Sequence, residues 1–201
     1  LVTSDDGNML IDSGTNVGAD IVARNVEALG FALTDIKGLL VSHEHFDHAG
    51  GMAKLQRITG ADVYTSWPAA PVIRSGNLSA DDPQFGMHEP MAPVANVRSV
   101  RDGETGKIGG VRVTAVSTPG HTPGAMSWAW QSCADDVCLD MVYADSLSPV
   151  SRDDYKFSDH PEYLAAYEAG LERLGRTDCA ILLTPHPSHS RMLKRMRQDR
   201  M

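Results

Sequence analysis

The pattern of apolar and polar residues along the chain predicts short strands interleaved with helices. Short apolar or alternating runs bounded by turn-forming residues are typical of strands. Expected strands cover residues 1–3, 9–12, 36–41, 62–65, 97–100, 110–117, 126–131, 139–144 and 180–183. Apolar residues at helical spacing predict helices over residues 18–29, 51–58, 68–74 and 161–174. This order predicts an α/β protein in which sheets are covered by helices.

Turn-forming residues indicate how these elements connect. Asp5-Asp6-Gly7-Asn8 is a hairpin signal between the first two strands. A four-residue turn at 134–137 is expected between the strands at 126–131 and 139–144. The segment 76–93 holds three prolines and two glycines and is predicted to be a long irregular loop. Loops of that length in a compact domain are usually functional or disordered.

Composition is that of one globular domain spanning residues 1–201. Hydrophobic residues make up 42% of the 201 positions, which is enough for a substantial core. The formal charge is −8, so neither nucleic acid nor an anionic membrane is an expected partner. The basic run at 191–200 is interpreted as a solvated helix face. No apolar run approaches the ~18 residues needed to span a bilayer. Because Leu1 already lies in an expected strand, we interpret the chain as processed or incomplete.

Three cysteines give the only sequence clue to compartment. Cys133 and Cys138 flank the predicted turn at 134–137 and are expected to close a hairpin disulfide, which would indicate an oxidising compartment. Two reduced, buried cysteines are the alternative. Cys179 is either a small core residue or has its partner beyond Met201.

The highest density of candidate metal-binding side chains lies in one hexapeptide. It reads His43-Glu44-His45-Phe46-Asp47-His48 and follows an apolar run. On an extended backbone His43, His45 and Asp47 share a face, and the two residues between them point the other way. A helix that begins near His48 would turn its imidazole toward the same pocket. The helical zinc motif H-E-x-x-H does not fit, because Asp47 stands where the second His is required. The alternative is a surface loop rich in His.

Three further polar segments also follow predicted strands, and they complete a set of metal ligands. They are His121 within Pro119–Gly124, Asp145-Ser146, and His186 between two prolines. His189 is the alternative to His186, but the flanking prolines favour His186. His88 and His160 are expected at the surface. Five imidazoles and an Asp suit two zinc ions, since zinc takes about four ligands and catalytic sites leave a position for water.

The ligands divide naturally between two metals. His43, His45 and His121 are assigned to the first metal, and Asp47, His48 and His186 to the second. Nitrogen and oxygen ligands favour Zn²⁺, with Fe or Mn as chemical alternatives. Two zinc ions ~3.5–4 Å apart would share a water and bring its pKa toward neutrality. This predicts hydrolysis of a carbonyl or phosphoryl compound.

The H-x-H-x-D-H motif, with a downstream Gly-His-Thr and a final His, resembles the metallo-β-lactamase superfamily. That resemblance implies an αβ/βα sandwich of two mixed sheets flanked by helices. More narrowly, the chain is similar to the third subclass (B3) of class B β-lactamases. Evidence for the subclass is His48, the serines in Tyr143-Ala144-Asp145-Ser146-Leu147-Ser148, and Leu183-Thr184-Pro185-His186-Pro187. The loop from Asp81 through Phe85-Gly86 to Asn96 is also similar.

The resemblance also implies a role for each residue that matches the motifs of the family. It implies the two ligand sets given above, with Ser146 and Ser148 facing the substrate carboxylate. Phe85 would line the cleft or serve as a hydrophobic anchor. Asp145 is ambiguous, because other superfamily hydrolases use an Asp near this point to bridge two metals. The family also has strands before a position like Leu1 and further chain after Met201. We therefore expect the sandwich to lack N-terminal strands, and Cys179 to lack its usual later partner.

The function implied by the resemblance is hydrolysis of the β-lactam amide bond, carbapenems included, by a hydroxide that bridges two Zn²⁺ ions. Asp47 would bind metal and orient the hydroxide. No S-x-x-K motif is present, so Ser146 is not expected to be a nucleophile. The resemblance also implies a periplasmic or secreted location, and a monomer acting on small molecules is expected. The alternatives are a superfamily lactonase or thioesterase, an Fe-dependent oxygenase on the same scaffold, or a non-catalytic zinc-binding protein.

Overall fold

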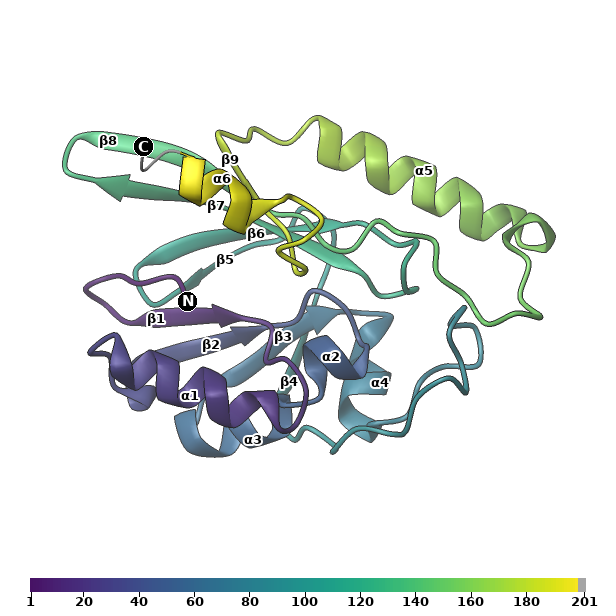
Figure 1. The fold of residues 1–201 in the computed structure, drawn as a ribbon, viewed down its shortest axis with the longest axis horizontal. Helices are drawn as coiled ribbons and strands as arrows, with labels where there is room; N and C mark the ends of the chain where they lie inside the picture. The colour runs from purple at the N-terminus through teal and green to yellow at the C-terminus, as the bar shows by residue number, and fades with distance from the viewer. Residues whose placement is uncertain (199–201) are drawn as a thin grey trace.

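The computed structural model describes residues 1–198, and these form two β-sheets packed face to face between layers of helix (Figure 1). The first sheet is built from the N-terminal half of the chain and the second from the C-terminal half. This confirms the predicted α/β sandwich. The end of the basic run, at Arg200, lies outside the described residues.

The first sheet has four parallel strands in the order β1-β2-β3-β4. Its strands are β1 (Asn8–Ile11), β2 (Ile36–Leu40), β3 (Asp62–Ser66) and β4 (Val97–Val100). Among these strands the sheet is parallel, whereas a mixed sheet was expected. The predicted first hairpin is reduced to one antiparallel bridge between Val2 and Met9, so residues 1–3 do not form a strand.

The second sheet is mixed and has the order β5-β6-β7-β8-β9. Its strands are β5 (Thr105–Ile108), β6 (Val111–Ser117), β7 (Met126–Ala134), β8 (Val137–Tyr143) and β9 (Ile181–Leu183). The first four pair antiparallel, and β9 joins β8 in parallel. Strand β5 was not predicted, because the sequence Thr-Gly-Lys-Ile is short, contains Gly and Lys, and is mostly exposed.

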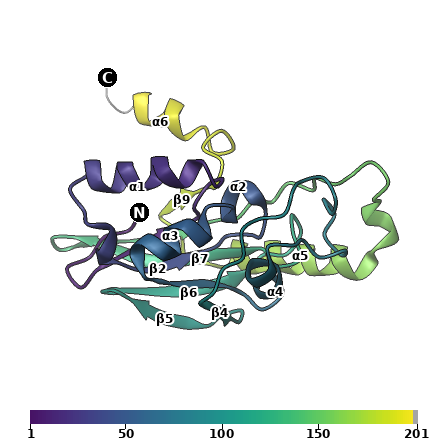
Figure 2. The same ribbon diagram turned by 90° about the horizontal axis from the view of Figure 1, so that it is seen from below.

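Helices flank the sandwich. They are α1 (Gly18–Ala28), α2 (Phe46–Ala49), α3 (Met52–Thr59), α4 (Ala69–Ser75), α5 (Pro161–Gly175) and α6 (Met192–Gln198), with 3-10 turns at Leu33–Asp35 and Phe157–Asp159. In Figure 2, α3 and α4 lie in front of the strands of the first sheet, and α1 lies beside α3. Helix α5 covers the opposite side, against β6. The basic helix predicted near the C-terminus is α6, and its residues are largely exposed.

Strand β2 shows why the apolar runs of the first sheet are continuous. Leu39 packs into the core under the helices, whereas the next residue, Leu40, packs into the core between the two sheets. Trp128 and Trp130 of β7 fill that second core from the opposing sheet. A strand buried on both faces needs apolar residues at successive positions rather than at alternate ones.

The hairpin β7–β8 is longer than predicted and its turn is tighter. Its strands run to Ala134 and from Val137, which leaves a two-residue turn in which Asp135 has φ 52°. Cys133 and Cys138 face each other across this hairpin and form the expected disulfide. Cys179 is exposed, so its interpretation as a core residue was wrong. Among residues 1–198, none of the helices is long and apolar enough to cross a membrane.

Candidate metal centre

The hexapeptide 43–48 follows β2 directly, at the edge where the parallel strands end. Its first three residues are buried, and helix α2 begins at Phe46, so His48 lies in a helical turn. The chain therefore bends two residues earlier than a helix starting at His48 would require. The bend brings the His48 ring to within 3.9 Å of the His43 ring, measured between centroids.

Three buried imidazoles form what we call the first donor group. Its members are His43, His45 and His121, and each offers a ring nitrogen within 4.8 Å of the others. His43 and His45 follow β2 of the first sheet, whereas His121 comes from the loop between β6 and β7 of the second sheet. The site therefore spans both halves of the sandwich.

The hydrogen bonds of these rings identify the nitrogen that each leaves free. His43 Nδ1 donates to Asp145 Oδ1 at 2.7 Å, and its buried Nε2 has no partner among the described residues. His121 Nδ1 donates to the Ser148 carbonyl at 2.8 Å, which leaves Nε2 free. A second hydrogen-bond partner of this kind is how metal-bound imidazoles are commonly oriented.

His45 uses its nitrogens in the opposite sense. Its Nε2 donates to the Asp82 carboxylate, with distances of 3.2 and 3.3 Å to the two oxygens, so Nδ1 is the free atom. Asp82 is fully buried within the long irregular segment 76–93. The sequence did not single out Asp82 for this role. The unusual length of the loop that contains Asp82 was the indication that this segment could be functional.

Asp47, His48 and His186 form what we call the second donor group. His48 Nε2 lies 3.2 Å from His186 Nε2 and 3.3 Å from the Asp47 carboxylate. His186 Nε2 lies 3.6 Å from the same carboxylate. Two ring nitrogens and an oxygen at these separations can share one cation. His43 and the two hexapeptide members of this group also offer ligand atoms within 4.8 Å of one another.

Asp12 orients His48 from the end of β1. Its carboxylate accepts hydrogen bonds from His48 Nδ1 at 3.0 Å, the Ser42 amide at 2.8 Å and the Tyr143 hydroxyl at 2.9 Å. Asp12 has φ 60°, an uncommon conformation for a residue other than glycine. The sequence placed Asp12 only at the end of an expected strand, because its partners belong to distant segments.

Protonation of these imidazoles depends on their carboxylate neighbours. Burial and the nearby His48 hold the pKa of His43 well below its usual range, and burial also lowers the pKa of His121. Burial alone would lower the pKa of His48, but hydrogen bonds to Asp12 and Asp47 raise it to about 10. Burial opposes ionisation of Asp47, yet the hydrogen bond from His48 holds its pKa below the usual range.

These observations test whether the site suits a metal ion. A buried, unpartnered His43 Nε2 costs free energy unless something occupies the space that it faces. The donor set is nitrogen and oxygen, which suits a divalent transition metal. A cation would also replace the proton held between His48 and Asp47. The residues therefore fit a metal ion.

Glu44 points away from both donor groups, as the strand alternation predicted. Its carboxylate accepts hydrogen bonds from Thr122 Oγ1 at 2.7 Å and from the Gly124 amide at 2.9 Å. Burial raises the pKa of Glu44 to about 7, although the hydrogen bond from Thr122 works against this. Glu44 thus contacts the loop that carries His121.

The serines named by the sequence lie close to the first donor group. Ser146 is buried, and its Oγ has no hydrogen-bond partner in the described part of the chain. Ser148 contacts the site through its carbonyl, which accepts from His121. Burial raises the pKa of Asp145 to about 8, and this carboxylate lies on the Nδ1 side of His43. That side is opposite to the free Nε2.

Phe85 lies farther out, in the segment 76–93. It is 45% exposed and lines a cavity of about 190 Å³ together with Phe46 and His88. The ring of His88 lies 4.5 Å from that of Phe46, although both side chains are exposed. The residues that line this cavity with Phe85 include no member of either donor group.

The remaining histidines lie as the sequence suggested, with one difference. His189 is exposed, with its ring 5.2 Å from that of His186, and the direct contact with His48 is made by His186. His160 is half-buried because it stacks on Tyr155 at 4.4 Å, whereas a surface position was expected.

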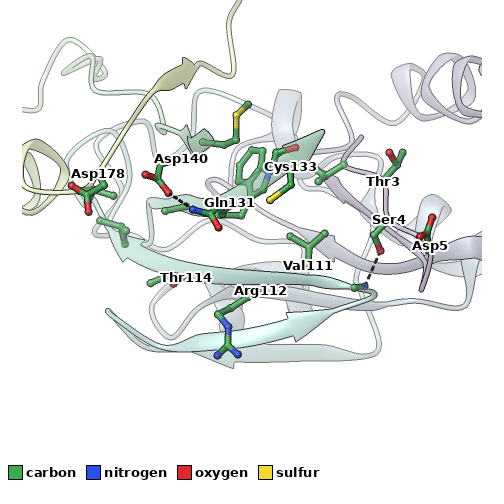
Figure 3. Close-up of a pocket in the computed structure, with 18 of the residues that line it drawn as sticks. Thr3, Ser4, Asp5, Val111, Arg112, Thr114, Gln131, Cys133, Asp140 and Asp178 are labelled. Carbon is green, nitrogen blue, oxygen red and sulfur yellow. Dashed lines mark hydrogen bonds between the residues drawn. The ribbon is translucent and has the colours of Figure 1, made fainter. Parts of the chain in front are cut away.

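A larger cavity, of about 900 Å³, lies at the second sheet and away from the donor groups (Figure 3). Val111, Arg112, Gln131 and Asp140 are among its lining residues, and Gln131 Nε2 donates to Asp140 on the neighbouring strand. No member of either donor group lines this cavity. Cavity size alone would therefore point to the wrong part of the molecule.

With this geometry established, comparison with known families identifies the chain. The family model described as the metallo-beta-lactamase superfamily matches residues 1–186. The chain belongs to the metallo-β-lactamase superfamily. Its paired sheets and flanking helices are the architecture of that family's solved structures.

Solved metallo-β-lactamases are similar over almost the whole chain. The MIM-2 metallo-β-lactamase is 53% identical with a TM-score of 0.90, over 97% of this chain and 72% of that one. MEM-A1, a subclass B3 metallo-β-lactamase from a soil metagenome library, is 42% identical with a TM-score of 0.93. That match covers 98% of this chain and 75% of MEM-A1. The resemblance to the third subclass is thereby confirmed.

One curated relative, matched by sequence, is a different kind of hydrolase. It is a hydroxyacylglutathione hydrolase of Bradyrhizobium sp. (strain ORS 278), 28% identical over 146 residues. The match covers 69% of this chain and 48% of that protein. The chain thus spans about half the length of the first curated relative that it matches.

Proposed function

We propose that this metallo-β-lactamase family member binds two zinc ions and hydrolyses the amide bond of β-lactams. The observation that carries the proposal is the convergence of two donor groups at one edge of the sandwich. The similarity to solved metallo-β-lactamases, at 53% and 42% identity, supports this substrate class over the thioesters of the more distant relative. Carbapenems are expected among the substrates.

The free nitrogens suggest how each metal would be held. The first donor group would bind one zinc through His43 Nε2, His45 Nδ1 and His121 Nε2, since their other nitrogens are already engaged. The second donor group would bind the other zinc through the Asp47 carboxylate, His48 Nε2 and His186 Nε2. Three protein ligands on each metal would leave a position open for water, as catalytic zinc sites require.

The bound metals would supply a nucleophilic water of lowered pKa and Lewis acidity toward the lactam carbonyl. Asp47 would orient that water, because its carboxylate is about one-third exposed and lies beside His48. Ser146 would bind the substrate carboxylate, since its hydroxyl lacks a partner within the described structure. Ser148 would contribute through its own side chain or a water, while its carbonyl orients His121.

The proposal is tested by measuring zinc content together with hydrolysis of a carbapenem and a cephalosporin by absorbance. We expect two zinc ions per chain and turnover that a chelator abolishes. Replacing His121 or Asp47 with Ala should remove most of the turnover. Wild-type rates in either variant, or zinc-loaded protein without β-lactam hydrolysis, would refute the proposal.

Thioester hydrolysis is the second candidate, favoured by the hydroxyacylglutathione hydrolase relative. The position of Asp145 argues against it. A bridging carboxylate would lie between the metals, but Asp145 Oδ1 accepts from His43 Nδ1, on the side opposite to the free Nε2. A panel of thioester and lactone substrates, assayed beside the β-lactams, separates these activities. One iron per chain without any hydrolysis would instead indicate an oxygenase.

We further propose that the protein works in an oxidising compartment, the periplasm or the extracellular medium. The Cys133–Cys138 disulfide supports this, because such bonds persist mainly outside the reducing cytosol. Titration of free thiols in the denatured, unreduced protein should then detect Cys179 alone. Detection of all three thiols in protein recovered from its native compartment would contradict it.

A further inference from the structure

The first donor group has to be assembled from two separate sheets. His43 and His45 follow β2, whereas His121 lies in the loop 118–125 that joins β6 to β7. A small displacement of that loop would move the free nitrogen of His121 away from the other two. Something must therefore hold the loop against the hexapeptide.

Glu44 makes that connection from inside the hexapeptide. It is 1% exposed and lies between His43 and His45 in the chain, so its backbone is fixed together with theirs. Its two carboxylate oxygens accept from opposite sides of one short loop segment, Oε2 from Thr122 and Oε1 from Gly124. Thr122 is the residue next to His121. The carboxylate thus joins the two segments that supply the first donor group.

The packing around Gly124 shows that this approach is close. A Cβ added at Gly124 would lie 2.7 Å from Glu44 Oε1 and 2.5 Å from the Ala69 Cβ, so a side chain would push the loop outward. Ser66 Oγ donates to the Gly124 carbonyl at 2.6 Å. The amide and the carbonyl of this one residue are therefore both held by side chains of the first sheet and its strand ends.

Other bonds between the same segments hold a different part of the chain. The Met126 amide donates to the Ser42 carbonyl at 2.7 Å, and Trp128 Nε1 donates to the Val41 carbonyl at 3.1 Å. These bonds fix the start of β7, after the loop has ended. Glu44 instead contacts the loop 118–125 itself, next to His121, whose imidazole belongs to the first donor group.

We propose that Glu44 is a positioning residue that clamps the His121 loop to the hexapeptide and thereby sets the affinity of the first metal site. The inference rests on the proposed two-metal function. Glu44 binds no metal itself, since both its oxygens are directed to Thr122 and Gly124 on the opposite side of the strand end. Loss of a partner that orients a ligand typically lowers metal affinity about 10–100-fold.

The test compares metal binding by the wild type with binding by Glu44→Ala, Glu44→Gln and Thr122→Val. Each metal-free protein is titrated with Co²⁺, and the absorption bands of the two sites are followed separately. The matched control is Gln56→Ala. Gln56 is also buried and holds backbone groups of distant segments, Ala95 and Asn96 among them, but it does not contact the site.

We expect Glu44→Ala and Thr122→Val to lower the affinity of the first site about 10–100-fold and to change the second site far less. Glu44→Gln should keep nearly the wild-type affinity, because an amide can still accept from Gly124 and donate to the Thr122 oxygen. Gln56→Ala should lower the melting temperature without changing either metal affinity. In the metal-free proteins, the NMR signal of the His121 Nδ1 proton should broaden only where the clamp is lost.

Three results would overturn the inference. The first is an unchanged first-site affinity in Glu44→Ala and Thr122→Val. The second is a loss of affinity that is equal at the two sites, parallels the loss of melting temperature, and also occurs in Gln56→Ala. The third is failure of Glu44→Gln to restore affinity. A wild type that binds no Co²⁺ would instead refute the proposed function, so the two failures are distinguishable.

Discussion

Asp12 and His48 are joined by a hydrogen bond of 3.0 Å that connects the end of β1 to helix α2. The bond occupies Nδ1 of His48 and directs Nε2 toward Asp47 and His186. Asp12 also accepts from Tyr143 of the second sheet, so one carboxylate links both sheets to the second donor group. The orientation of His48 is thus determined by residues far from it in the sequence.

Replacing Asp12 with Asn should weaken the second metal site. An amide can accept from His48 through only one oxygen and can no longer serve all of the donors that Asp12 serves now. We expect a loss of about 10–100-fold in affinity for the second metal, measured by competition with a coloured chelator. Asp20→Asn is the control, because Asp20 is exposed and pairs with Lys54 on the surface. Equal metal affinities in the two variants would contradict the role of Asp12.

Removal of the metal should abolish β-lactam hydrolysis without unfolding the chain. Two separate apolar cores lie under the helices and between the sheets, and neither includes a member of either donor group. Dialysis against a chelator should therefore eliminate turnover while the far-ultraviolet circular dichroism spectrum persists. Addition of Zn²⁺, but not of Mg²⁺, should restore the activity, since Mg²⁺ prefers oxygen ligands. Activity that survives complete metal removal would exclude the proposed chemistry.

Gly120→Ala should destabilise the protein and disturb the first donor group. Gly120 has φ 149°, and a Cβ there would lie 2.0 Å from the ring of Tyr167 on α5. Strained backbone and overpacking each cost about 1–3 kcal/mol. We expect a loss of at least about 2 kcal/mol in urea unfolding, together with lower turnover. Gly106→Ala is the control, since that position on β5 is exposed and open. Similar unfolding free energies for the two variants would show that the loop adapts.

The stability of the metal-free protein should depend on pH through Glu44. Burial raises its pKa in the folded state to about 7, against 4.5 when exposed, so between these values the folded state holds the extra proton. The contribution of Glu44 to the stability of the folded state is therefore complete below pH 4.5 and is lost as the pH rises through 7. As the pH rises across this window, the free energy of unfolding of the wild type should fall by up to about 3 kcal/mol relative to that of Glu44→Gln. Urea unfolding at several pH values measures the free energy of unfolding of both proteins. A difference between them that stays constant or grows in favour of the wild type as the pH rises would contradict this prediction.

Local patterns in the sequence determined the elements and the ligand types. Successive apolar residues predicted strand β2, and the alternation in the hexapeptide predicted that Glu44 turns away from His43 and His45. These features depend on side chains a few residues apart, whose relative directions follow from backbone geometry alone. The short strand β5 had too little apolar character to be predicted in this way.

The tertiary structure decided which partners orient those ligands. Asp12, Asp82 and Asp145 bond to His48, His45 and His43 from segments 36, 37 and 102 residues away. No periodicity relates such pairs, because they meet only when the strand ends gather at one edge of the sandwich. The sequence by itself therefore predicted a metal site and the residues that belong to it. Only the folded chain determined which nitrogen each imidazole directs into the site, since that choice depends on the carboxylate or carbonyl packed behind it.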